Sequence, residues 1–195
     1  MRTAVSAAAL LAMAAQACAD PLTDLLDGHD GQLCYERVYD AAHLAKHPRQ
    51  RTRAVRLSLT DYPETGGANI RVAITEASRA HHILGECYWA DEANLDGMGG
   101  PLVPSFGRKA GLDCHAITTT DGSSAEEGGD FPLDLRDGAS VMLHLPDEVA
   151  AWKSLDDVSG AAEFFELGPD DRVFRLDRAN AAVCTDLNEK LPWLL

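Results

Sequence analysis

Apolar and polar residues alternate with a period of two in three neighbouring stretches of the chain. In 50–60 the residues Val55, Leu57 and Leu59 are apolar, and the residues between them are polar. This period is typical of a β-strand that has one face in a hydrophobic core. The same alternation recurs in 70–75 and 83–89, after short turn-rich segments. We therefore predict three antiparallel strands that form a meander.

Shorter strand-like stretches lie on both sides of this meander. Strands are predicted in 32–39 and 112–120, in a hairpin around Asp137-Gly138 (131–135 with 141–145), and in a last hairpin (164–167 with 172–178). The pattern predicts only short helical turns, in 20–30, 40–47 and 147–157. About eight or nine short strands with few helices predict an all-β fold, either a single antiparallel barrel or a sandwich.

The segment from Met1 to Ala19 has the pattern of a secretory signal peptide. Arg2 is followed by an uncharged apolar run in 4–15 and by the small-residue cleavage pattern Ala17-Cys18-Ala19. A lipoprotein modified at Cys18 is the alternative, although no large aliphatic residue stands in the three positions before it. The apolar run is too short for a transmembrane segment, which needs about 20 residues. We expect cleavage after Ala19, a periplasmic or secreted location, and a single β-rich domain over 20–195.

Four cysteines remain after this segment, and an even number in an exported chain predicts two disulfides. Their wide spacing does not match zinc-binding or redox motifs. Three pairings are possible. A closed up-and-down barrel places its first and last strands side by side, so we favour Cys34–Cys184. The second pair, Cys87–Cys114, would then bridge the Gly/Pro-rich connection 91–111.

The chain is acidic, with 31 Asp and Glu residues against 17 Lys and Arg residues and a formal net charge of −14. A negative balance of this size argues against binding to nucleic acid or to an anionic membrane surface. We expect no cofactor, because no phosphate-binding glycine loop is present. No nucleophile motif is present either, so we name no catalytic residue.

A basic cluster before the central strand is the best candidate for a ligand site. Arg49, Arg51 and Arg53 have the same parity as Val55. If the strand is regular from 49 onward, the three guanidinium groups continue the inward-facing row at the mouth of a barrel. They could then bind a carboxylate or phosphate. The alternative is that 48–52 is a loop whose arginines pair with acidic residues of the chain.

His43 and His47 are four residues apart, which on a helix places them on one face. Such a pair is a weak candidate for a metal site, because the sequence places no third ligand. Asp40, His81 and His82 are candidates only by assumed proximity. The nearby Lys46 and Arg49 disfavour a cation, so a structural or surface role is the preferred interpretation.

Two segments, CYERVYDAAHLAKHPRQ (34–50) and GPDDRVFRLDRANAAVC (168–184), resemble segments of small exported proteins of unknown function in Gram-negative bacteria. The resemblance implies export and a β-rich domain, and it implies no activity. Our leading hypothesis is a non-catalytic binder of a small or anionic ligand. The alternatives are a protein–protein or inhibitor-like envelope module, which would use 91–111 and the apolar tail, and a hydrolase whose site is assembled from distant residues.

Overall fold

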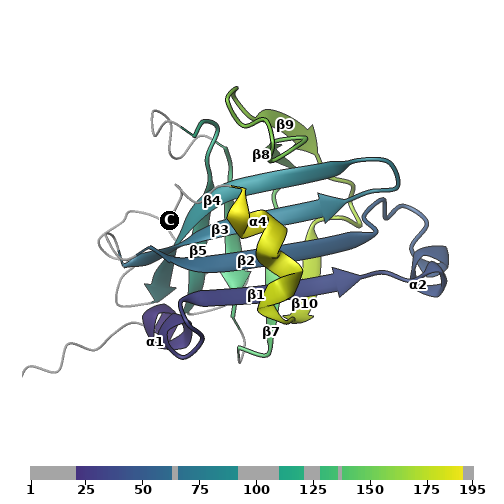
Figure 1. Ribbon diagram of the computed structural model, residues 1–195. Helices are drawn as coiled ribbons and strands as arrows, with labels where there is room; N and C mark the ends of the chain where they lie inside the picture. Colours follow the sequence, from purple (N-terminus) through teal and green to yellow (C-terminus); the bar gives the residue numbers. More distant parts are fainter. Residues whose placement is uncertain (1–20, 63–65, 92–109, 121–127, 136–137, 191–195) are drawn as a thin grey trace, which may run out of the picture.

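The computed structural model of the protein describes residues 21–62, 66–91, 110–120, 128–135 and 138–190. Eight of its strands close into an antiparallel barrel in the order β1-β10-β7-β6-β5-β4-β3-β2 (Figure 1). The barrel strands are β1 (Gln32–Val38), β2 (Ala54–Tyr62), β3 (Gly67–Thr75), β4 (Ala80–Asp91), β5 (Ala110–Ala116), β6 (Asp130–Asp134), β7 (Ser140–His144) and β10 (Val173–Arg178). The predicted all-β antiparallel fold is confirmed, and it is a barrel.

The predicted meander and the predicted closure are both present. β2, β3 and β4 are consecutive antiparallel neighbours, with Leu57 opposite Val72 and Val72 opposite Ile83. β1 pairs with β2 on one side and with β10 on the other, where Tyr35 lies opposite Arg178. The first and last strands of the barrel are therefore adjacent, as the sequence predicted.

The barrel interior is filled by side chains of the alternating apolar residues. Tyr35, Phe131 and Phe174 are its largest aromatic residues, and each is almost completely buried. They pack in one cluster with the inward-facing residues of the meander, among them Leu57 and Ile70. An eight-stranded barrel is just wide enough for side chains to fill it. A ligand site in the described part of the chain therefore has to lie outside this filled interior.

Both ends of the barrel are covered. Helix α1 (Pro21–Asp27) buries Leu22 and Leu26 against one end of the core. At the opposite end, where β2 begins and β3 ends, a two-stranded sheet is formed by β8 (Glu148–Ala151) and β9 (Glu163–Glu166). This β8–β9 sheet contributes Val149 and Phe165 to the same core cluster.

The β8–β9 sheet corrects two of our predictions. The sequence predicted a helical turn in 147–157, but 148–151 is a strand, and Trp152 forms a β-bridge with His82 of β4. The predicted last hairpin is also wrong, because β9 pairs with β8 while β10 pairs with β7 and β1. The physical reason is that Phe174 and Leu176 of β10 are needed inside the barrel. The Gly168-Pro169 turn therefore leads from one sheet into the other.

A second apolar cluster lies on the outer wall of the barrel. The 3₁₀-helix η2 (Ala181–Cys184) and helix α4 (Thr185–Glu189) cross the outside of β1, β2 and β3 (Figure 1). Leu187 and Trp152 are buried there against the outward-facing Leu84. Arg71 is also fully buried and donates to Thr60 Oγ1 (3.0 Å) and Asn188 Oδ1 (3.4 Å). Burial lowers the pKa of Arg71 to about 10, so it stays charged at neutral pH.

Both predicted disulfides are formed. Cys34–Cys184 ties the C-terminal helical segment to β1 across a sequence separation of 150. Cys87–Cys114 joins residues that lie directly opposite each other in β4 and β5. Within the described segments, no helix has the length and apolar character that crossing a membrane requires.

Candidate functional site

The three predicted site arginines lie in the segment that connects helix α2 (Ala41–Lys46) with β2. The regular strand begins at Ala54, so Arg49, Arg51 and Arg53 do not form one row of that strand. Thr52 is buried between Arg51 and Arg53, whose side chains are exposed. Arg49 donates to Asp170 Oδ1 at 2.8 Å. In this part the structure agrees with the alternative interpretation, in which the arginines pair with acidic residues of the chain.

Asp171 fixes the backbone of this segment. Its two carboxylate oxygens accept hydrogen bonds from the backbone N–H groups of Arg51 and Thr52, each at 3.0 Å, and Asp171 is only 1% exposed. A buried carboxylate that accepts two backbone hydrogen bonds is satisfied without a cationic partner. The position of Arg51 is thereby set by its main chain, while its side chain reaches over the end of the barrel.

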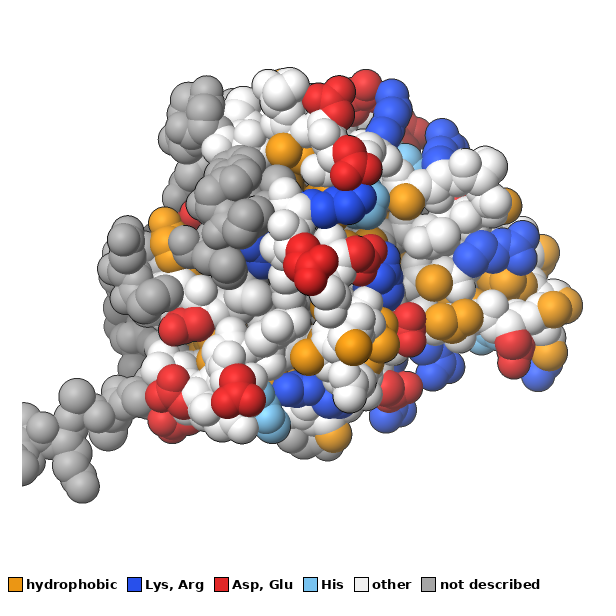
Figure 2. All heavy atoms as spheres, in the orientation of Figure 1, with side chains coloured by type: hydrophobic (Ala, Val, Ile, Leu, Met, Phe, Trp, Pro, Cys, Tyr) orange, Lys and Arg blue, Asp and Glu red, His pale blue; other side chains and the backbone are white. Residues whose placement is uncertain are grey.

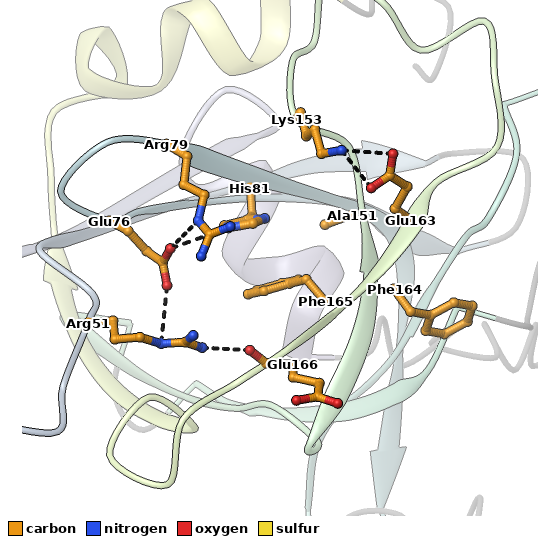
Figure 3. A pocket seen from close by; sticks show the side chains of 10 residues that line it. All are labelled: Arg51, Glu76, Arg79, His81, Ala151, Lys153, Glu163, Phe164, Phe165 and Glu166. Atoms are coloured by element: carbon orange, nitrogen blue, oxygen red, sulfur yellow. Dashed lines mark hydrogen bonds and ion pairs between the residues drawn. The ribbon is translucent and has the colours of Figure 1, made fainter.

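A cavity of about 390 Å³ opens beside Arg51 (Figure 3). It lies between the pre-β2 segment, the β3–β4 turn and the β8–β9 sheet. Three cations and three carboxylates line it, together with an aromatic residue and a histidine. They are Arg51, Arg79, Lys153, Glu76, Glu163, Glu166, Phe165 and His81; Ala151 and Phe164 complete the lining. Arg49 and Arg53 do not line this cavity, so one of the three predicted arginines is part of it.

On one wall of the cavity, the Glu76 carboxylate contacts two arginines. Its carboxylate accepts a hydrogen bond from Arg79 Nε at 2.6 Å and lies 3.3 Å from Arg51 Nε. The Glu76 side chain is 10% exposed. Burial raises the pKa of Glu76, but the hydrogen bond from Arg79 and the charges of Arg51, Arg79 and His81 together lower it below the ordinary value. Glu76 is therefore ionised, and it holds two guanidinium groups on the same side of the cavity (Figure 3).

His81 forms the floor of the cavity together with Phe165. Their rings stack with centroids 4.1 Å apart and an interplanar angle of 6°. His81 Nε2 has no hydrogen-bond partner among the described residues, and it lies 3.7 Å from Glu76 Oε2, too far for a hydrogen bond. Burial lowers the pKa of His81, with Glu76 opposing the shift. The floor is therefore a neutral, flat aromatic pair at neutral pH.

His43 and His47 lie on and next to α2, beside a smaller cavity of about 290 Å³. Their rings stack on each other with centroids 4.4 Å apart, and His43 Nε2 donates to Gln50 Oε1 at 3.0 Å. Among the described residues, no group of three His, Cys, Asp or Glu side chains is placed to hold a metal ion. His81, one of the proposed third ligands, lines the other cavity.

The hydrolase alternative requires a His–Asp pair beside a hydroxyl or thiol group. His115 on β5 donates from Nδ1 to Asp130 Oδ1 at 2.8 Å, and its Nε2 lies 3.8 Å from Asp113 Oδ2. Neither ring nitrogen contacts a hydroxyl or thiol group in the part of the chain that the structure describes. Within the described residues, the pair therefore has no neighbouring nucleophile of the kind that a hydrolytic triad needs.

On the face shown in Figure 2, acidic and basic side chains lie next to one another and form no large patch of one sign. The acidic excess of the sequence is therefore not concentrated on this face. The segments predicted to bind a protein partner lie mainly outside the described residues, because 92–109 and 191–195 are not part of them.

Sequence reasoning did not identify the residues that surround Arg51. The parity of Ile83 and Cys87 extends to His81 and could have placed that side chain at the end of the barrel interior. No local pattern could have brought Phe165 onto His81, because the contact joins two sheets 84 positions apart in the sequence, from 81 to 165.

We compared the chain with protein-family models, curated proteins and solved structures, and no match was found among them. The resemblance of 34–50 and 168–184 to small exported bacterial proteins therefore stays a prediction. The function has to be argued from the geometry of the cavity beside Arg51.

Proposed function

We propose that the protein is an exported, non-catalytic binding protein that holds a small ligand in the cavity between Arg51 and the β8–β9 sheet. The observation that carries the proposal is the position and size of this cavity, about 390 Å³ at a covered barrel end. Cavities that hold small ligands have volumes of about 300–1,000 Å³. The lining combines a flat aromatic floor with six charged side chains, so it is more polar than most small-ligand sites and suits a polar or charged ligand.

Export is part of the proposal and rests on two features. The segment Met1–Ala19 has the signal-peptide pattern. The two disulfides fit a protein that folds in an oxidising compartment, since disulfides persist there and are rare in reducing ones. These two features together support a periplasmic or secreted location.

Native mass spectrometry of the protein purified from its own host tests the proposal. We expect a retained small molecule on the wild type and on Arg175→Gln, an exposed arginine outside the cavity. The same molecule should be lost or reduced in Phe165→Ser, which removes the aromatic floor. A retained molecule that is unaffected by Phe165→Ser would show that the ligand binds elsewhere and would contradict the proposal.

A protein partner is the second candidate, supported by Phe164. Its side chain lies on β9, next to Glu163, and is 50% exposed. The interior of the neighbouring barrel is filled by side chains. An exposed aromatic residue is a frequent anchor of a protein interface. A photo-crosslinking amino acid at 164, used in intact host cells, should yield one discrete adduct if the protein is an envelope or inhibitor-like module. The same amino acid at 175 should yield none.

A further inference from the structure

Glu76 holds Arg51 and Arg79 in a way that leaves three of their four terminal nitrogens available among the described residues. Both guanidinium groups approach the Glu76 carboxylate through Nε, at 3.3 Å for Arg51 and 2.6 Å for Arg79. Arg51 Nη2 donates to the backbone oxygen of Glu166 at 2.6 Å. Among the described residues, Arg51 Nη1 and both terminal nitrogens of Arg79 have no partner. Glu76 thus orients two cations and leaves Arg51 Nη1 and both terminal nitrogens of Arg79 for an added anion.

These amino groups are accessible from the cavity. The side chains of Arg51 and Arg79 are 46% and 61% exposed. Figure 3 shows both guanidinium groups on the side of the cavity that carries Glu76, with the ring of Phe165 beside them. A carboxylate placed between the two guanidinium groups would accept charge-assisted hydrogen bonds from both, which are stronger than neutral ones.

The floor beside this anion position is flat and apolar. The ring of Phe165 is backed by His81, so its orientation is fixed by stacking before any ligand arrives. A planar group next to the carboxylate would lie on this floor, and aromatic contacts of this kind contribute about 0.5–1.5 kcal/mol beyond area burial. His81 is neutral for the reason given above, so the floor carries no net charge.

The charges of the lining limit how much negative charge a ligand can carry. The three cations are balanced by three carboxylates, and Lys153 already pairs with Glu163 at 2.7 Å on the far side. Asp171 adds a further carboxylate oxygen 3.9 Å from Arg51 Nε. A single negative charge fits between Arg51 and Arg79, whereas a doubly charged group would meet the fields of Glu76 and Asp171.

We infer that the cavity takes a small organic monoanion with a flat apolar body, its carboxylate between the terminal amino groups of Arg51 and Arg79 and its body on Phe165. The inference rests on the proposed function and specifies the class of ligand. It also assigns Glu76 as a positioning residue that fixes the two arginines and does not itself contact the apolar body.

Four probes that share a phenyl ring and differ in charge test the inference: benzoate, its isostere benzamide, benzylammonium and phenyl phosphate. Binding to the full chain is followed by ¹H–¹⁵N chemical-shift titration of the cavity amides. We expect benzoate to bind about tenfold more tightly than benzamide, the ratio that one charge-assisted hydrogen bond supplies. Benzylammonium should bind more weakly than benzamide, and phenyl phosphate more weakly than benzoate.

Two variants of Arg79 and one control variant locate the anion. Arg79→Gln should reduce the benzoate-to-benzamide ratio to about one. Arg175→Gln, the control outside the cavity, should leave that ratio unchanged. Arg79→Lys keeps the charge but loses the paired amino groups, so it should restore only part of the preference for benzoate. A benzoate preference that survives Arg79→Gln in a folded variant would overturn the inference.

The outcomes separate the inference from the proposed function. If benzamide binds in the cavity as tightly as benzoate, the small-ligand function stands and the monoanion inference fails. A preference for benzylammonium or for phenyl phosphate would likewise overturn the monoanion inference and leave the small-ligand function standing. If no probe shifts the cavity amides at millimolar concentration, the inference is overturned, and the retained-molecule experiment alone then decides the proposed function.

Discussion

His81 and His82, neighbours in β4, each hold one strand of the β8–β9 sheet against the barrel. The ring of His81 stacks on Phe165 of β9. The backbone of His82 exchanges two hydrogen bonds with Trp152 at the end of β8, at 2.8 and 2.9 Å. The sheet that supplies Phe165 to the floor of the cavity is therefore attached through the ring of His81 and the backbone of His82.

We predict that the free energy of unfolding falls at acidic pH, because burial lowers the pKa of both histidines. Burial lowers the pKa of His81 against the opposing charge of Glu76, and burial followed by the charge of Arg56 lowers the pKa of His82 against the opposing charge of Asp186. The unfolded chain therefore takes up protons near pH 6.5 before the folded chain does. The free energy of unfolding should fall as the pH drops from about 6.5 towards the folded pKa values, by at most about 1.4 kcal/mol per pH unit for each histidine.

Urea unfolding between about pH 7.5 and pH 5.5 measures this dependence, since the window lies above the ordinary carboxylate range. The groups that face the two rings are Glu76, Arg79 and Arg51 for His81, and Arg56, Asp186 and Lys190 for His82. A double variant with glutamine at 81 and 82 should unfold with a flatter pH profile. A wild-type profile that is flat in this window would show that the histidines do not couple stability to pH.

Asp171 and its neighbour Asp170 should differ sharply when each is replaced by alanine. Asp171→Ala removes two backbone hydrogen bonds to a buried carboxylate and should cost about 3 kcal/mol or more of unfolding free energy. Asp170→Ala removes an ion pair with the largely exposed Arg49 and should cost less than about 1 kcal/mol. Equal losses in urea unfolding would contradict the role assigned to Asp171.

A glycine inside the barrel should tolerate no side chain. A Cβ at Gly85 would overlap the carbonyl oxygen of His115 on the neighbouring strand, and backbone cannot move aside there. Gly85→Ala should destabilise the protein by about 1–3 kcal/mol or more. Gly160→Ala is the matched control, because nothing lies within 4 Å of the added methyl group. Thermal unfolding of both variants measures the difference, and equal midpoints would argue against this close approach of β4 and β5.

The two disulfides should contribute unequally to stability. In a chain-entropy description, Cys34–Cys184 closes a loop with a separation of 150 and contributes about 5 kcal/mol, while Cys87–Cys114, with a separation of 27, contributes about 3.5 kcal/mol. Urea unfolding of the paired serine variants should rank them in this order. If removal of Cys34–Cys184 were the milder change, the helical segment would have to be held on the outer wall by other contacts.

The barrel could be predicted because the alternation of apolar and polar residues that specifies a strand is local and recurs from one strand to the next. The alternation around Val55 identifies an inward face, and the number of short strands then favours a barrel or a sandwich. The β8–β9 sheet could not be predicted in the same way. Its strands are four residues each and show no clear alternation, as in Glu163–Glu166, and their partners are fixed by which strands the barrel core requires.

The candidate site was predicted only in part, for a related reason. Parity predicted a row of three arginines at a barrel end, but it could not show that the strand begins only at Ala54 or that Asp171 holds the preceding backbone. Glu76, His81 and Phe165 meet there through turns and sheets that are distant in the sequence. Such contacts follow from the closed fold and leave no pattern of spacing in the chain.

The pairing of β1 with β10 imposes an order of events on synthesis. A chain is made from its N-terminus, so β1 and the meander are made before β10. Until residues 173–178 are made, one edge of β1 has no partner strand. Cys87 and Cys114 can pair once β5 is made, whereas Cys34 has its native partner only after Cys184 is made. A truncation before β10 would therefore not give a smaller barrel. It would give an open sheet in which one edge of β1 has no partner strand. Cys34 of β1 would also lack its disulfide partner.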